Sequence, residues 1–526
     1  MFVSRSFARA ARSLAAATAL LCATASMAQD RDPDTLVAAF AAEGTVLDPT
    51  RLIAGVDQYY LAQMFETLVR PDPDGKMVNW LAESWSLGEE EGKTVIDVRL
   101  RKDVTFHNGD PMTSADFEFS YQRSKDPKIS RQPQRQAKVE RFEIVDDHHF
   151  KLHFSEPDGA YIAMYLQLYA IPKAYFESVG EEGFAAAPVG TGPWKFVSRE
   201  LKDNLKLTRY DGYWNNEHMP QVKNLTIRII PEDLTRVAAF KSGDVDWIDS
   251  VPPAMVSDIA AMDGVETFST ISGNHLYIDF PSFDEKSPFS KLEVRQAIAQ
   301  GFDLDAIITS ILHGQGQRYN GVGVDSVNHD SSLANYAYDP AAARELLAKA
   351  GYPNGFDTPC YNLTTQREPF VKEVGEAIFA YLQTIGVRCQ VQGLEYAAWL
   401  DMMRRKPDHA ADGIISTMSG QGIPSDPANV WVLHLHEYVP GGGLGAFSMT
   451  KDETANGLVR ELQGTMEPAR RSELIKQIGR YKHENVLGGI PTYQPIVTLA
   501  WRDRIKFKPW PFPGYWRGFQ DVSIAN

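Results

Sequence analysis

The sequence is short of basic residues. Its 526 residues include 53 lysines and arginines against 68 aspartates and glutamates, for a formal net charge of −15. A general nucleic-acid binder needs a basic surface to neutralise phosphates, so this balance argues against that class. The chain also lacks low-complexity tracts, and its content of 43% hydrophobic and 23% charged residues is typical of a globular protein.

The motifs of common enzyme families are missing as well. We find no GxSxG elbow, no SxxK, no HExxH and no GxxxxGK[ST] phosphate loop. Among the twelve histidines, His434 and His436 are predicted to share one face of a strand. No cysteine or acidic pair near them completes a metal site. We therefore expect no catalytic residues, no metal and no cofactor.

Long apolar runs are absent, and no stretch reaches 18 uninterrupted apolar residues. A short run over residues 14–22 follows three arginines and precedes Ser26-Met27-Ala28, which has small residues at its first and third positions. This order is typical of a secretory signal peptide, and the run is too short for a stable membrane anchor. We predict export, with cleavage after Ala28.

Cysteine is scarce, and of the three present only Cys360 and Cys389 remain once the signal is removed. A helix over about 367–385, ending at Gly386, is predicted between two strands that carry these cysteines. Parallel neighbours in such a unit bring the sulfurs within reach, and exported proteins keep disulfides. The pair is a disulfide candidate, and two buried free thiols are the alternative.

The chain is too long for a single hydrophobic core, because single cores stop growing near roughly 250–300 residues. Alternating apolar residues predict a strand over 95–101, and residues 142–154 predict a hairpin. Capping boxes at 113–116 and 290–293 predict helix starts, as does Asp339 followed by proline. We predict a mixed α/β or α+β protein with at least two lobes.

A series of motifs runs through the chain after the signal. They are LAESW at 81–85, RLRKDVTFHNG at 99–109, PMTSADF at 111–117, PVGTGPW at 188–194, YW at 213–214, FKSGDVD at 240–246, VRQAI at 294–298, FD at 302–303, YDP at 338–340 and LLAKAGYP at 346–353. In these motifs the sequence is similar to the family 5 extracellular solute-binding proteins, the peptide/nickel-type receptors of ABC importers. The resemblance covers nearly all of the chain after the signal.

This resemblance implies an α/β clamshell of two lobes, the type II periplasmic binding protein fold, with an extra subdomain in the first lobe. It implies a periplasmic monomer that captures a solute between its lobes and delivers it to an inner-membrane permease, without catalysis. A chaperone or signalling receptor on the same fold remains an alternative. The implied pieces are 29–72, 189–273 and 489–526 for the first lobe, 73–188 for the subdomain and 274–488 for the second lobe.

The resemblance also implies ligand-binding positions. Peptide receptors of the family place an aspartate for the ligand's amine where this chain has Ile423, unless Asp426 replaces it in a rebuilt loop. A peptide or peptide-like ligand is therefore one expectation, and a non-peptide solute such as an opine, an oligosaccharide or a metal chelate is the other. Arg404 and Arg405 are candidates for an anionic group. The remaining candidates are Glu43, Gly44, Thr45, His275, Trp399, Met418, Ser419, Gly420, Gln421, Gly422 and Tyr493.

Overall fold

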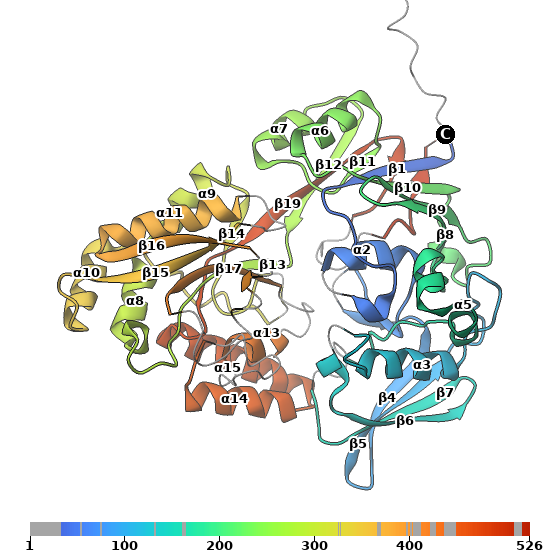
Figure 1. Ribbon diagram of the computed structural model, residues 1–526, viewed down its shortest axis with the longest axis horizontal. Helices are drawn as coiled ribbons and strands as arrows, with labels where there is room; N and C mark the ends of the chain where they lie inside the picture. The colour runs from blue at the N-terminus through green and yellow to red at the C-terminus, as the bar shows by residue number, and fades with distance from the viewer. Residues whose placement is uncertain are drawn as a thin grey trace, which may run out of the picture.

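The protein has two lobes that lie side by side (Figure 1). The predicted signal peptide lies outside the described residues. No helix in the described part of the chain is long and apolar enough to cross a membrane. The computed structural model describes residues 33–52, 55–73, 76–130, 133–159, 165–324, 326, 328–364, 370–395, 398–399, 402, 412–420, 428–435, 449–509 and 518–525.

The first lobe is built on an eight-stranded sheet within the described residues. Its central strand is almost wholly apolar because both faces are covered. Leu36, Ala38 and Phe40 face one core cluster, while Val37 and Ala39 face another. The spatial order is β12 (Val265–Ile271), β19 (Tyr493–Arg502), β11 (Trp247–Ile248), β1 (Thr35–Phe40), β10 (Asn224–Ile229), β9 (Asn204–Arg209) and β8 (Trp194–Glu200), with β14 (Gly316–Arg318) pairing with β19.

Helices cover both faces of this sheet. The first of the two clusters is completed by α2 (Gly55–Met64) and α5 (Lys173–Ala186), and the second by α6 (Asp233–Ser242) and α7 (Val256–Ala260). Strands β9 and β10 are antiparallel neighbours in this sheet.

The second lobe is built on a five-stranded sheet. Helices α8 (Leu292–Gln300), α9 (Leu304–Ser310), α10 (Pro340–Lys349) and α11 (Val371–Thr384) cover one face, where Leu276, Ile278 and Cys360 enter the core. Helices α13 (Ala428–Leu435), α14 (Glu453–Gly464) and α15 (Pro468–Asn485) pack together around Trp431. The strand order is β16 (Val387–Leu394), β15 (Phe356–Leu363), β17 (Ile414–Gly420), β13 (Asn274–Asp279) and β18 (Ile490–Pro491).

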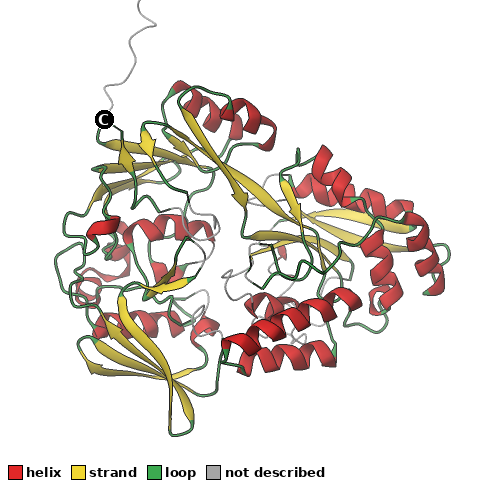
Figure 2. Ribbon diagram, turned by 180° about the vertical axis from the view of Figure 1, so that it is seen from behind, coloured by secondary structure: helices red, strands yellow, loops and turns green. Residues whose placement is uncertain are grey.

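The extra subdomain of the first lobe has a sheet and a core of its own (Figure 2). The predicted hairpin over 142–154 is confirmed, and Ile96, Val98 and Leu100 are buried as their alternation predicts. The order is β4 (Ala82–Glu90), β5 (Lys93–Leu100), β7 (His149–Phe154) and β6 (Val139–Asp146), with α3 (Ser114–Lys125) on this sheet and a pair β2 (Val69–Pro71) and β3 (Met77–Asn79) beside it.

A helix begins at all three predicted starts, but only two of them have the predicted cap. Thr113 and Asp116 form the capping box of α3, and Asp339 caps α10. The box at Ser290 does not form, because Ser287 caps a short 3-10 helix there and α8 begins only at Leu292.

The strand predicted at His434 is also wrong. His434 lies in α13, where Ala428, Trp431 and Leu435 recur at helical spacing and are buried. His436 lies outside the described residues.

The PVGTGPW motif joins the extra subdomain to the first lobe. A Cβ at Gly190 would lie 2.1 Å from the carbonyl oxygen of Met64, so only glycine permits this close approach. The buried ring of His107 accepts a hydrogen bond from the Gly190 N–H at Nδ1 (3.2 Å) and, through Nε2, lies 2.9 Å from the carbonyl oxygen of Gly192. An Nδ1 that accepts and an Nε2 that donates define a neutral imidazole.

This geometry predicts a loss of stability in acid. Burial lowers the pKa of His107 to about 4. Because the unfolded chain takes up the proton near pH 6.5, stability falls as the pH drops from about 6.5 towards 4, by about 2 kcal/mol between pH 7 and pH 5. Denaturant unfolding at both pH values should show this loss reduced in His107→Gln and unchanged in His313→Gln, a substitution at an exposed histidine. Equal losses in all three proteins would contradict it.

The two cysteines lie on neighbouring strands. As predicted, α11 joins two parallel strands, and Gly386 follows it with a φ of +99°. Cys360 on β15 and Cys389 on β16 have their Cα atoms 5.3 Å apart, and their sulfurs are bonded.

We predict that this bond is present in the exported protein. A loop of this length stabilises the fold by about 3–4 kcal/mol in the chain-entropy model. The double variant Cys360→Ala/Cys389→Ala should unfold at a lower denaturant concentration than the wild type, and reductant should lower the wild-type midpoint only. Two titratable thiols in the denatured, unreduced protein would show that the bond does not form.

Candidate ligand-binding site

The lobes are joined by two chain segments that cross side by side. One runs from β12 to β13 through Ser272 and Gly273, and the other from β18 to β19 through Thr492. The Ser272 N–H donates to the carbonyl of Pro495 (2.7 Å), and the Thr492 N–H donates to that of Leu276 (3.0 Å). Since β18 lies in the second sheet, we place the second crossover at Thr492 rather than at 489.

Gln494 ties both crossovers together. Its side chain is fully buried. Nε2 donates to the carbonyl of Ser272 (3.2 Å), and Oε1 accepts from the Val324 N–H (2.7 Å). No sequence motif pointed to Gln494. Its hydrogen-bond partners lie about 170 and 220 positions away in the chain, so no local pattern could indicate its role.

The carboxyl ends of the strands in each sheet point towards the other lobe. β1 is parallel to β11, which is antiparallel to β19, the strand that enters from the second lobe. In the second sheet, β15 is parallel to β16 and β17, and β17 is antiparallel to β13, which begins at the crossover. Ligands of open α/β sheets bind outside the carboxyl ends of strands, so the region between these two edges is the candidate site.

The segment that follows β1 forms a braced rim at this edge, which we define as residues 41–45. The Tyr60 hydroxyl of α2 donates to the carbonyl of Ala42 (2.8 Å), and burial raises the pKa of Tyr60. The Thr45 N–H donates to Asp57 (2.6 Å). A Cβ at Gly44 would lie only 2.6 Å from the Tyr60 ring, so the rim can sit this close only with glycine there.

Glu43 is the centre of the rim. Its carboxylate accepts from Arg199 (2.9 Å) and from the Lys202 N–H (3.1 Å), and Arg199 also donates to the carbonyl of Gly44. The Glu43 charge is therefore neutralised within the protein. By contrast, its main-chain N–H and C=O form no hydrogen bond to another described residue.

The candidates of the second lobe fall into two groups. Ser419 and Gly420 pair with His275 and Asn274, which places these backbones at the edge beside the crossover. Met418 packs against the core of the lobe instead.

Three aromatic candidates are covered rather than open. His275 and Tyr493 are buried at the crossovers, where His275 lies against the ring of Tyr319 (centroids 4.7 Å apart). Trp399 is partly buried against Ile415. Five further candidates lie outside the described residues: Arg404, Arg405, Gln421, Gly422 and Asp426, as does Ile423.

A buried charged cluster lies elsewhere in the second lobe. The Lys482 ammonium donates to the carbonyls of Leu487 (2.6 Å) and Gly488 (2.9 Å), which follow α15. Burial lowers the pKa of Lys482 and raises that of Asp279. Burial likewise lowers the pKa of His434 to about 3. These groups support the turn after α15 and do not lie at the strand edge.

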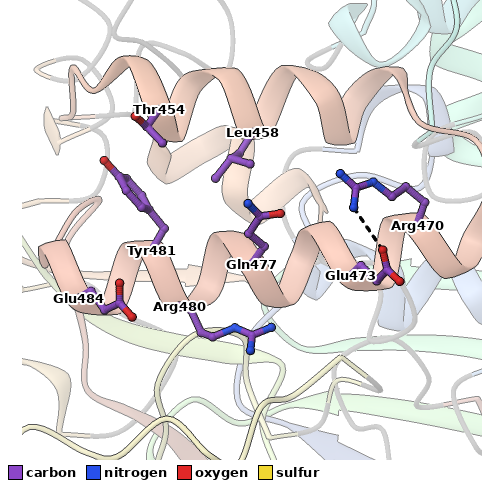
Figure 3. A pocket seen from close by; sticks show the side chains of 8 residues that line it. All are labelled: Thr454, Leu458, Arg470, Glu473, Gln477, Arg480, Tyr481 and Glu484. Carbon is purple, nitrogen blue, oxygen red and sulfur yellow. Dashed lines mark hydrogen bonds and ion pairs between the residues drawn. The ribbon is translucent and has the colours of Figure 1, made fainter.

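A surface groove of about 470 Å³ runs between α14 and α15 (Figure 3). One of its arginines, Arg470, pairs with Glu461 (2.6 Å) and Glu473 (3.2 Å). No group of metal ligands occurs among the described residues. The groove is lined by Thr454, Leu458, Arg470, Glu473, Gln477, Arg480, Tyr481 and Glu484.

Comparison with known families agrees with this geometry. Residues 76–438 match the model of bacterial extracellular solute-binding proteins, family 5 middle. The chain belongs to this family. Family members are extracellular receptors that bind solutes, and their fold is the two-lobed α/β clamshell described above.

Several relatives carry names that state a ligand. The chain is 28% identical to the glutathione-binding protein GsiB of Pectobacterium atrosepticum, over 67% of each chain. It is also 28% identical to di/tripeptide-binding protein 1 of Pseudomonas aeruginosa, over 93% of this chain and 94% of that one. Among solved structures, the periplasmic binding protein AgaA of A. tumefaciens R10 in complex with agropinic acid is 26% identical, with a TM-score of 0.76 over 94% of this chain and 99% of that one.

The residues that brace the rim were not predicted from the sequence. Asp57 and Tyr60 lie in α2, and Arg199 lies in β8, more than 150 positions after Glu43. The only local signal was Gly44. The reason that glycine is needed at this position becomes clear once the Tyr60 ring is located.

We predict that Gly44→Ala weakens solute binding. The added Cβ pushes the rim away from Tyr60 and displaces the main chain of Glu43, which should reduce affinity about tenfold, or ~1.4 kcal/mol. Isothermal titration with a solute that the wild type binds measures this change in affinity. Gly88→Ala is the matched control, because a Cβ there meets nothing within 4 Å. Unchanged affinity in Gly44→Ala would remove the rim from the site.

Proposed function

We propose that this protein is the periplasmic receptor of an ABC importer and binds a peptide or peptide-like solute between its lobes. The observation that carries the proposal is the hydrogen-bonded rim at the strand edge, where the main chain of Glu43 forms no hydrogen bond to another described residue. An extended ligand with amide groups pairs with such an edge through main-chain hydrogen bonds. The relatives named for glutathione and for di- and tripeptides support the same ligand class.

The charge of the rim bears on how such a ligand is held. The Glu43 carboxylate is already occupied by Arg199 and the Lys202 N–H, so it is not an anchor for a ligand ammonium. The sequence position of the amine-binding aspartate carries Ile423. We therefore propose that recognition rests on amide groups and on an anionic end, with Arg404 and Arg405 as the candidates for the latter.

An opine is the second candidate ligand. The likeness to the AgaA complex with agropinic acid favours it, and an opine needs no free α-ammonium anchor of the peptide type. Under either ligand the protein delivers its cargo to a membrane permease and leaves it chemically unchanged. The division of the chain into first lobe, extra subdomain and second lobe is part of the same proposal, with the second crossover at Thr492.

Matched ligand pairs test the proposal. We expect isothermal titration with di- and tripeptides, glutathione, opines, oligosaccharides and metal chelates to find one class that binds tightly. If peptides bind, an N-acetylated peptide should bind within about threefold of the free one, because no carboxylate anchors the amine. Mass spectrometry of the released solute should show no conversion.

Two results would contradict this. A free tripeptide whose binding is abolished both by acetylation and by Asp426→Ala would restore an amine anchor. Turnover of the solute by the wild type, lost when the rim is altered by Gly44→Ala, would replace the receptor function with catalysis.

A further inference from the structure

The two lobes touch at a second place, far from the crossovers. The end of α14 reaches the extra subdomain on the side away from β19, as both ribbon views show (Figures 1 and 2). There the Gly159 N–H of the subdomain donates to the carbonyl of Gln463 (2.8 Å). Met466, in the turn between α14 and α15, packs against the core of the subdomain.

The contact around Gly159 leaves no room for a side chain. A Cβ on this residue would lie 1.7 Å from Nη1 of Arg471 and 2.3 Å from the carbonyl oxygen of Thr465. Arg471 is itself buried and donates to the carbonyls of Leu462 and Thr465, both at 2.8 Å. The guanidinium therefore holds the turn in the shape that receives Gly159.

The subdomain side of the contact is also fixed. Asp158 is buried and accepts a hydrogen bond from the Tyr165 hydroxyl (2.9 Å), and Lys138 lies 3.7 Å from its carboxylate. This loop links the sheet of the subdomain to the rest of the first lobe, so it moves with that lobe. The turn between α14 and α15 moves with the second lobe.

We propose that the α14–α15 turn is a latch, formed by Gln463, Thr465, Met466 and Arg471, that closes on Gly159 and holds the lobes together around the solute. The crossovers and the latch lie at opposite ends of the lobe interface, so rotation about the crossovers separates the latch first. The proposal assumes the solute-binding function proposed above, but closure of the latch does not depend on which solute binds.

The latch couples to affinity through the population of the closed form. Apparent affinity falls in proportion to the fraction of protein in the binding-competent state. A weaker latch therefore releases solute faster, while the association rate changes little. This predicts an effect on binding from residues that do not contact the solute.

Gly159→Ala tests the latch, and Gly464→Ala is its matched control. Gly464 ends α14 in the same turn, but a Cβ there meets nothing within 4 Å. Met466→Ser removes the apolar contact without a clash and serves as a second variant. Paired labels on cysteines introduced by Gly88→Cys and Gly457→Cys, both in open space, report the distance between the lobes.

We expect a short label distance in the unliganded wild type and in Gly464→Ala, and its loss in Gly159→Ala and Met466→Ser. For a bound solute, the dissociation rate should rise about tenfold or more in the latter two. The proposal is overturned if Gly159→Ala and Gly464→Ala have the same label distance and the same affinity. It is also overturned if neither the addition of solute nor the Gly159→Ala substitution changes the label distance seen in the wild type. If no solute binds the wild type, the receptor function fails, and the unliganded distances still decide the latch.

Discussion

The whole arrangement depends on the hydrogen bonding between two adjacent crossover segments. Because the Ser272 N–H donates to Pro495 and the Thr492 N–H donates to Leu276, the lobes are joined by two segments that are hydrogen-bonded to each other's surroundings rather than by two independent linkers. Gln494 adds a fully buried amide that bonds to the first crossover and to a loop of the second lobe. Such a joint permits rotation of one lobe against the other while it resists twisting and separation, which is how hinge closure around a ligand works.

The two sides of the candidate site, one from each lobe, differ in the groups that form them. On the first-lobe side, the charged group of the rim, the Glu43 carboxylate, is already paired with Arg199 and the Lys202 N–H. On the second-lobe side, the strands β15, β16 and β17 end at the same edge.

Local signals in the sequence predicted much of the fold. Apolar alternation in β5, the caps of α3 and α10 and the strand–helix–strand unit around α11 each depend on residues close together in the chain, and each is confirmed. The failures have the same origin. At Ser290 the predicted capping box does not form, because Ser287 nearby acts as the cap. The predicted strand at His434 is part of a helix, whose apolar face becomes clear only once its core is known.

Long-range pairs could not be predicted in this way. The ion pair of Arg199 with Glu43 and the contact of Gly159 with Gln463 join residues 156 and more than 300 positions apart. The family motifs located the rim at Glu43, Gly44 and Thr45, but nothing in those three residues indicates that their neighbours neutralise the carboxylate. That neighbouring groups already occupy the Glu43 carboxylate becomes clear only when their positions in the fold are known.

The position of β19 has a consequence for how the chain acquires its structure. This strand, near the C-terminus, lies between β12 and β11, and β11 in turn borders β1 near the N-terminus. The first lobe therefore cannot complete its sheet until residue 502 has emerged, because the pairing closes loops of hundreds of residues, and non-local pairing of this kind is slow. Until then the sheet lacks an internal strand, and β11 and β12 have no partner between them.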